Sequence, residues 1–339
     1  MKVRALHWLL PLAVVLLAAL IVAAPLAMAV AVVLICAGPH NWCEARYFLS
    51  RMPARWGRLR PAFLVGLSGV VSLTAGFVGL SLVPSAFPSL SDEGHLSLLA
   101  AWQTMVIAWV VTLCLLRVRL DRQSRQRVEL KLDAYVHQGE RTRVVRIVAV
   151  AALACTAAWL WPLWSSVALV FAHPLLALVF LDRELSLRRV AWQPAWRTTM
   201  ALLPAVLVAV WWGTTGVDAA PLVATPKAAQ VGAFLLPDAA APALLATHVL
   251  LESLHYGVWI VGIPLTTAAL PWHLRGVPLV AASRAWRRWL AAGLAVGGAM
   301  VVGLWILFAI DYAWTRQAYF TIAVAHVLAE VPFLVLFRR

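Results

Sequence analysis

Three histidines are each followed, four residues later, by a glutamate within mostly apolar sequence. The three pairs are His40 and Glu44, His248 and Glu252, and His326 and Glu330. On a helix, this spacing places the imidazole and the carboxylate on the same face, one turn apart. Because imidazole and carboxylate are ligands that proteins use for iron and zinc, the pairs predict helices that bind a metal ion.

Two further histidines, His173 and His255, also lie within apolar runs. We therefore predict five metal ligands: His40, His173, His248, His255 and His326. A charged side chain at the centre of a bilayer costs about 2.5–3.5 kcal/mol, so each one needs a partner or a function. Glu252 and Glu330 are predicted catalytic residues, as carboxylate ligands or as partners of a ligand imidazole, and Glu44 is predicted to orient one. Hydrogen bonding between helices is the alternative role for each polar side chain.

The elements that carry these residues are predicted to be membrane-spanning helices. Of 339 residues, 63% are hydrophobic and only 12% are charged, which excludes a soluble globular protein. A bilayer is crossed by about 20 apolar residues in a helix. We predict an all-α membrane bundle, with residues 1–339 as a single transmembrane domain and ten spans: 5–22, 26–44, 62–83, 98–116, 145–163, 166–181, 198–217, 243–270, 289–310 and 318–337. The first two spans are separated at Ala23-Ala24-Pro25.

The net charge of +14 is explained by membrane topology. Lys and Arg concentrate in short cytoplasmic connections, and in the ten-span topology all of them except Lys227 and Arg316 fall on one side. We therefore predict a multi-pass protein of the bacterial plasma (inner) membrane, with both termini cytoplasmic and no nucleic-acid partner. Nine spans, with an external amino terminus, are the alternative topology. A signal peptide cleaved after Ala27-Met28-Ala29 is the alternative for the first span.

The segment Gly38-Pro39-His40-Asn41-Trp42-Cys43-Glu44 resembles the G-x-P-H-x-x-x-D element of the Brp/Blh-type membrane carotene dioxygenases of bacteria and archaea, with Glu44 in place of Asp. His173, His255 and His326 are similar in kind to the later histidines of that family. The family has a helical membrane fold whose histidines hold a non-haem iron, and it cleaves β-carotene to retinal. The resemblance implies an iron-dependent oxygenase that uses dioxygen.

These observations favour a membrane-embedded iron oxidoreductase that acts on a lipid-soluble isoprenoid or acyl substrate. Membrane lipid, this hydrophobic substrate and dioxygen are the predicted partners, and iron (Fe²⁺) is the predicted cofactor, with zinc as the alternative. Other candidate functions are a proton- or metal-coupled transporter, a zinc-dependent intramembrane hydrolase with Glu252 or Glu330 as general base, and a scaffold. The cluster Asp182-Arg183-Glu184 is predicted to be a solvated helix end.

Overall fold

The computed structural model describes residues 3–51, 57–87, 89–126, 133–215, 241–266 and 277–336. Within these ranges the regular structure is entirely helical. Nine of the helices so described are long and apolar enough to cross a membrane, and a shorter apolar stretch, Ala323–Leu336, follows. The prediction of an all-α, multi-pass membrane bundle is confirmed.

Each predicted span coincides with a helix of the structure. In chain order these helices are α1 (Val3–Ala23), α2 (Pro25–Arg51), α3 (Arg60–Ala86), α4 (Asp92–Gln126), α5 (Asp133–Leu160), α6 (Pro162–Arg188), α7 (Gln193–Thr214), α10 (Ala241–Gly257), α13 (Arg284–Ile310) and α14 (Tyr312–Leu336). After α10 the chain continues through a π-helical segment, η4 (Val258–Gly262), into α11 (Ile263–Thr266). A short helix, α12 (Pro278–Ala282), precedes α13. The last residues of the predicted span 243–270, from 267 onward, lie outside the described ranges.

Helix ends follow local chemistry. The break between α1 and α2 falls at Ala24, as predicted, and Pro25 begins α2. Proline is tolerated at the first position of a helix because its missing N–H would have no intrahelical partner there. Helix α4 extends beyond the predicted span 98–116 at both ends because charged residues continue it past the apolar segment.

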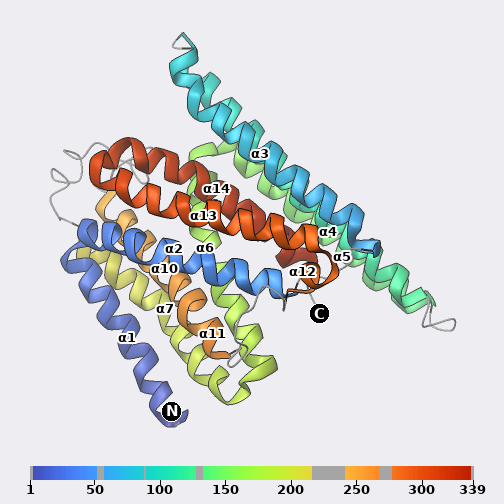
Figure 1. The fold of residues 1–339 in the computed structure, drawn as a ribbon, viewed down its shortest axis with the longest axis horizontal. Helices are drawn as coiled ribbons and strands as arrows, with labels where there is room; N and C mark the ends of the chain where they lie inside the picture. Colours follow the sequence, from blue (N-terminus) through green and yellow to red (C-terminus); the bar gives the residue numbers. More distant parts are fainter. Residues whose placement is uncertain are drawn as a thin grey trace. The chain divides into compact units, whose positions relative to one another are not determined.

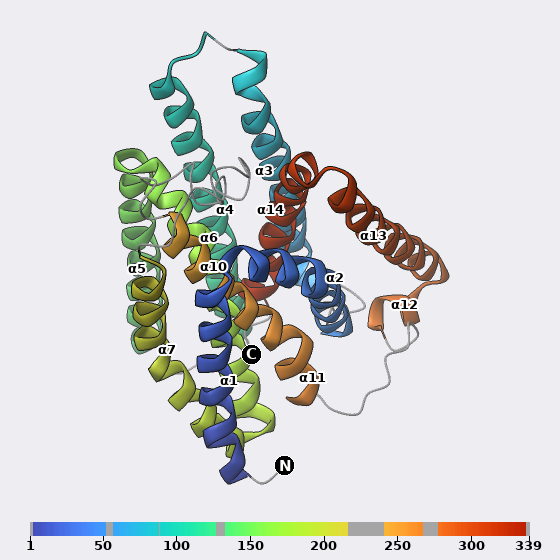
Figure 2. The same ribbon diagram turned by 90° about the vertical axis from the view of Figure 1, so that its left-hand side faces the viewer.

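The helices form two compact units, each described here by itself: Met1–Met52 with Ala168–Ala313, and Pro53–Val167 with Trp314–Arg339. In the first unit, α1 packs along α7, and α10 packs against both α2 and α7 (Figures 1 and 2). In the second unit, α4 packs between α3 and α5. The boundary between the units falls within α6 at residue 168, so the later part of α6 belongs to the first unit.

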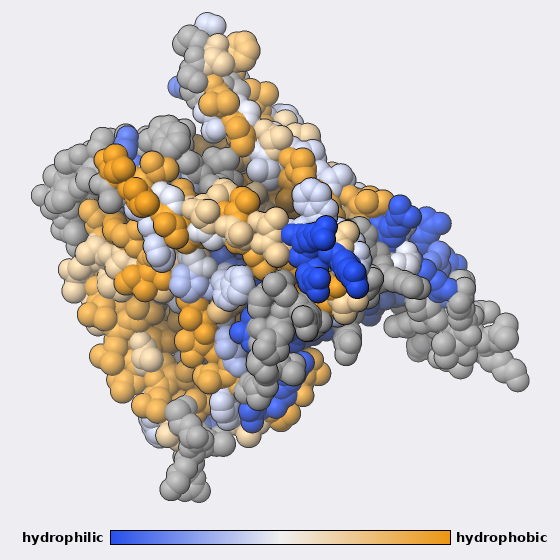
Figure 3. Space-filling model, viewed as in Figure 1, coloured by the Kyte–Doolittle hydropathy of each residue, from blue (hydrophilic) through white to orange (hydrophobic). Residues whose placement is uncertain are grey.

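The first unit presents apolar side chains outward along α1 and α7. In Figure 3 the surface around α1, at the lower left, is mainly orange, the colour of hydrophobic residues. Large side chains that are 45% exposed or more include Trp8, Leu12, Leu16 and Leu20 on α1 and Leu202, Val208 and Trp212 on α7. Such a continuous exposed apolar surface would be a liability in water, whereas the acyl chains of a bilayer solvate it.

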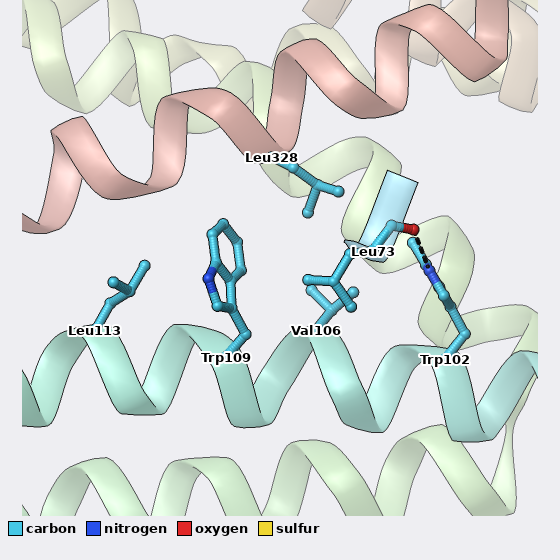
Figure 4. Close-up of a cluster of buried hydrophobic side chains, with 6 residues drawn as sticks. All are labelled: Leu73, Trp102, Val106, Trp109, Leu113 and Leu328. Atoms are coloured by element: carbon cyan, nitrogen blue, oxygen red, sulfur yellow. Dashed lines mark hydrogen bonds between the residues drawn. The ribbon is translucent and has the colours of Figure 1, made fainter. Parts of the chain in front are cut away.

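In the second unit, the close packing of α3 against α4 depends on a glycine of α3 that faces a tryptophan of α4. The indole nitrogens of Trp102 and Trp109 on α4 donate 2.9 Å hydrogen bonds to the carbonyl oxygens of Leu73 and Val65 on α3. A Cβ atom on Gly69 of α3 would overlap the Trp109 indole. Figure 4 shows the resulting apolar cluster, to which Leu328 of α14 contributes. These tryptophans therefore join helices within the unit.

Candidate metal centre

Three helices of the first unit bring a histidine to one buried place. His40 lies on α2, His173 on α6 and His255 on α10. His40 is 3% exposed and His255 is 1% exposed, while His173 is half-buried. Side chains from separate helices that converge inside a bundle are the usual way in which helical proteins build metal sites.

Each of these three helices is irregular near its histidine. Pro39 lies inside α2 directly before His40, and Pro174 lies inside α6 directly after His173. Proline removes one backbone hydrogen bond and bends a helix. On α10, the π-helical segment η4 begins three residues after His255. Single π-helical turns are frequent at functional sites, so all three irregularities point to this cluster.

His255 is the central member of the cluster. Its ring centroid lies 4.6 Å from that of His173, with the ring planes at 46°, and 5.3 Å from that of His40, with the planes at 73°. A ring nitrogen of His255 and one of His173 lie within 4.8 Å of each other. His255 is therefore close enough to each of the other two imidazoles to share an ion with it after small side-chain adjustments, because bonds between an imidazole nitrogen and such a metal are about 2.0–2.1 Å long.

The carboxylate of Glu44 also belongs to this cluster. Glu44 is 2% exposed and follows His40 by one helical turn on α2. One of its oxygen atoms and one ring nitrogen from each of His40 and His255 lie within 4.8 Å of one another. The structure thus places the predicted orienting residue where it can itself serve as a ligand.

His248 and Glu252 lie elsewhere on α10. Nδ1 of His248 is 3.8 Å from Oε2 of Glu252, and the His248 ring packs edge-on against Phe171 of α6. Among the described residues, neither belongs to a group with metal-binding spacing. His248 precedes His255 by two helical turns, about 10 Å along the axis, so one ion cannot contact both side chains without a large displacement.

The remaining predicted pair, His326 and Glu330, lies on α14 in the second unit. Nε2 of His326 is 3.2 Å from Oε1 of Glu330, so the predicted contact across one helical turn is present. The Glu330 side chain is 5% exposed, and that of His326 is 24% exposed. That His326 binds the metal ion and that Glu330 is catalytic stay predictions.

Several aromatic residues near the cluster were missed from the sequence. The ring of Tyr256 stacks on His40, with centroids 4.2 Å apart and planes at 30°. Trp259, only 1% exposed, packs against Tyr47, Phe48 and Phe180, with ring centroids 5.5–5.7 Å apart. The Tyr256 ring therefore covers one face of the His40 imidazole. The spacing of Glu252 and Tyr256, one turn apart, was the available sequence signal for Tyr256.

The predicted solvated character of the cluster 182–184 is wrong for Glu184, which is only 6% exposed. Its Oε1 accepts a 2.6 Å hydrogen bond from the Tyr47 hydroxyl. Its Oε2 lies 3.1 Å from a guanidinium nitrogen of Arg51 and 3.1 Å from one of Arg188. A carboxylate with three such partners is stable when buried, which hydropathy alone does not indicate. Asp182, by contrast, is partly exposed and pairs with Arg197 at 2.9 Å.

Comparisons with known proteins add no assignment: no family model, no curated protein and no solved structure matches this chain.

Proposed function

We propose that this chain is a membrane-embedded, histidine-ligated iron oxidoreductase that uses dioxygen to oxidise a lipid-soluble isoprenoid or acyl substrate. The observation that carries the proposal is the convergence of His40, His173 and His255 with Glu44 inside the first unit. Two buried imidazoles and a half-buried one, on three different helices, are a costly arrangement in a membrane protein, so a function is expected for them.

The donor set fits a non-haem iron ion. Two imidazoles and one carboxylate, here from His40, His255 and Glu44, are the ligand types of the non-haem Fe(II) oxygenases, and His173 offers a further imidazole. A bound iron ion would supply the redox chemistry needed to activate dioxygen. The protein would hold the ion, orient its ligands through their hydrogen-bonding partners and exclude water.

The depth of the cluster supports a lipid-soluble substrate. His40, His173 and His255 each lie within about one turn of the middle of a helix long and apolar enough to span a membrane. A centre held at that depth is surrounded by hydrocarbon, where an acyl or isoprenoid chain is soluble and a charged metabolite is not. The substrate bond that reacts would therefore lie inside the hydrocarbon chain of the substrate.

The proposal is tested by metal analysis of the full-length protein, purified in detergent, followed by measurement of oxygen uptake. We expect about one tightly bound iron ion per chain, and oxygen uptake on addition of an isoprenoid or long-chain acyl lipid. Stoichiometric zinc without oxygen uptake would favour the hydrolase instead, because zinc has no redox chemistry. Absence of any tightly bound metal would contradict both enzymatic functions.

A further inference from the structure

Tyr256 connects the candidate metal centre to another part of α10. It directly follows His255 and is 3% exposed. Its ring lies nearly parallel to the His40 imidazole, with centroids 4.2 Å apart, and meets the His255 ring edge-on at 5.7 Å. The Tyr256 side chain therefore contacts two of the proposed ligand imidazoles, and it restrains the orientation of the His40 ring.

The hydroxyl of Tyr256 is in turn held by Glu252. It donates a 2.5 Å hydrogen bond to Oε1 of Glu252, one turn earlier on the same helix. Oε2 of Glu252 is 3.8 Å from Nδ1 of His248. The Glu252 side chain is 18% exposed, in the helix with the largest buried share among the candidate spans. A short hydrogen bond of this kind is the interaction that makes a carboxylate acceptable there.

We propose that Glu252 is a positioning residue of the metal centre, acting through Tyr256 on the imidazole of His40. This inference rests on the proposed function, because it takes His40 to be a ligand. A ligand imidazole binds well only when its ring plane points at the ion, and Tyr256 holds that plane. The carboxylate restrains the tyrosine ring through its hydroxyl. Loss of such an orienting partner typically weakens metal binding about 10- to 100-fold.

Titration of the full-length protein in detergent with Co²⁺ tests this role, because the visible spectrum of Co²⁺ reports ligand geometry as well as binding. Tyr256→Phe keeps the ring but removes the hydroxyl, and Glu252→Ala removes the acceptor. For both we expect a shifted spectrum and an affinity about 10-fold or more below that of the unaltered protein. Glu252→Gln retains an acceptor oxygen, so we expect it to restore the original spectrum.

Ser253→Ala is the matched control. Ser253 adjoins Glu252, but its hydroxyl donates a 2.6 Å hydrogen bond to the carbonyl oxygen of Val249 within the same helix. We expect this variant to bind Co²⁺ with the unaltered affinity and spectrum. The double variant Glu252→Ala/Tyr256→Phe should bind Co²⁺ no more weakly than the single variant with the lower affinity, because both changes break the same hydrogen bond.

The outcomes separate this inference from the proposed function. Unaltered Co²⁺ affinity and spectrum in Glu252→Ala and Tyr256→Phe would overturn the positioning role and leave the metal centre intact. A loss of Co²⁺ affinity in Glu252→Gln as large as in Glu252→Ala would also overturn the positioning role, because Glu252 would then be a ligand itself. No Co²⁺ binding by the unaltered protein would overturn the metal centre and this inference together. Size-exclusion profiles and helical circular dichroism establish that each variant is folded.

Discussion

The hydroxyl of Tyr47 donates a 2.6 Å hydrogen bond to Oε1 of Glu184 and thereby joins α2 to α6. The guanidinium of Arg51 lies 3.4 Å from the centroid of the Tyr47 ring and also contacts Glu184. Tyr47 follows His40 by about two turns along α2. Glu184 follows His173 by about three turns along α6. This contact therefore fixes the relative height of two helices that carry proposed ligands.

We expect Glu184→Ala to lower the free energy of unfolding by about 1.5–3 kcal/mol, because it removes a buried acceptor with charged partners. Asp182→Ala is the control. The Asp182 pair with Arg197 is more exposed, with side-chain exposures of 29% and 64%, so its removal should cost about 0–1 kcal/mol. Thermal unfolding in detergent measures both. Equal losses in the two variants would show that Tyr47 and Glu184 do not join the helices as described.

Gly69→Ala should destabilise the second unit. A Cβ atom there would overlap the Trp109 indole, and overpacking of this kind costs about 1–3 kcal/mol. Gly79 lies on the same helix, with no atom within 4 Å of the position of an added Cβ. Gly79→Ala should therefore be neutral or stabilising, because alanine favours a helix more than glycine does. A stable Gly69→Ala variant in the same unfolding assay would contradict the packing of α3 against α4.

Trp259 and Trp102 should respond differently to replacement by phenylalanine. The indole nitrogen of Trp259 has no hydrogen-bond partner in the part of the chain that the structure describes, whereas that of Trp102 donates to Leu73. Trp102→Phe should therefore cost about 0.5–1.5 kcal/mol more than Trp259→Phe. Trp259→Ala should be worse than either, at about 3–5 kcal/mol, because it leaves a cavity. A larger loss for Trp259→Phe than for Trp102→Phe would indicate a bound acceptor at Trp259.

The ten-span topology predicts that a tag before residue 3 is accessible from the cytoplasm. Helices α1 and α2 are separate, and each is long and apolar enough to cross the membrane, so the chain should return to its starting side. Protease protection in oriented membrane vesicles measures the location of the tag. A tag on the external side would support the nine-span alternative and leave the carboxyl terminus cytoplasmic.

The helices were predictable from the sequence because nine of those described carry an apolar run of membrane length and the last, α14, carries a shorter one. The ends of the helices were less predictable. Helix α4 begins at Asp92 and α5 at Asp133, both well outside the predicted spans, since hydropathy marks where lipid ends and a helix can continue into water. The π-helical segment Val258–Gly262 contains no proline, but Pro264 follows it and cannot donate a hydrogen bond to the carbonyl oxygen of Ile260 within the segment.

Within the candidate site, the contacts inside a single helix were predictable from the sequence, whereas the contacts between helices were not. The spacing of His326 and Glu330 correctly placed both on one helical face, because that contact depends on helix geometry alone. Contacts between helices depend on the rotation and height of each helix, which spacing does not determine. For this reason spacing alone did not show that His255 contacts two other histidines while His248 contacts Phe171. It also did not reveal the buried hydrogen bond from the Tyr47 hydroxyl to Glu184.

The proposed binding of metal by imidazoles from α2, α6 and α10 is tested most directly by the metal content of single-histidine variants. His95 on α4 is the matched control, since its ring nitrogen contacts the carbonyl oxygen of Ser91 in its own chain segment. We predict that His40→Ala, His173→Ala and His255→Ala each lose most of the iron while His95→Ala retains it. The same measurement on His326→Ala tests the prediction for α14. Retention of iron in all of the α2, α6 and α10 variants would contradict metal binding by these histidines.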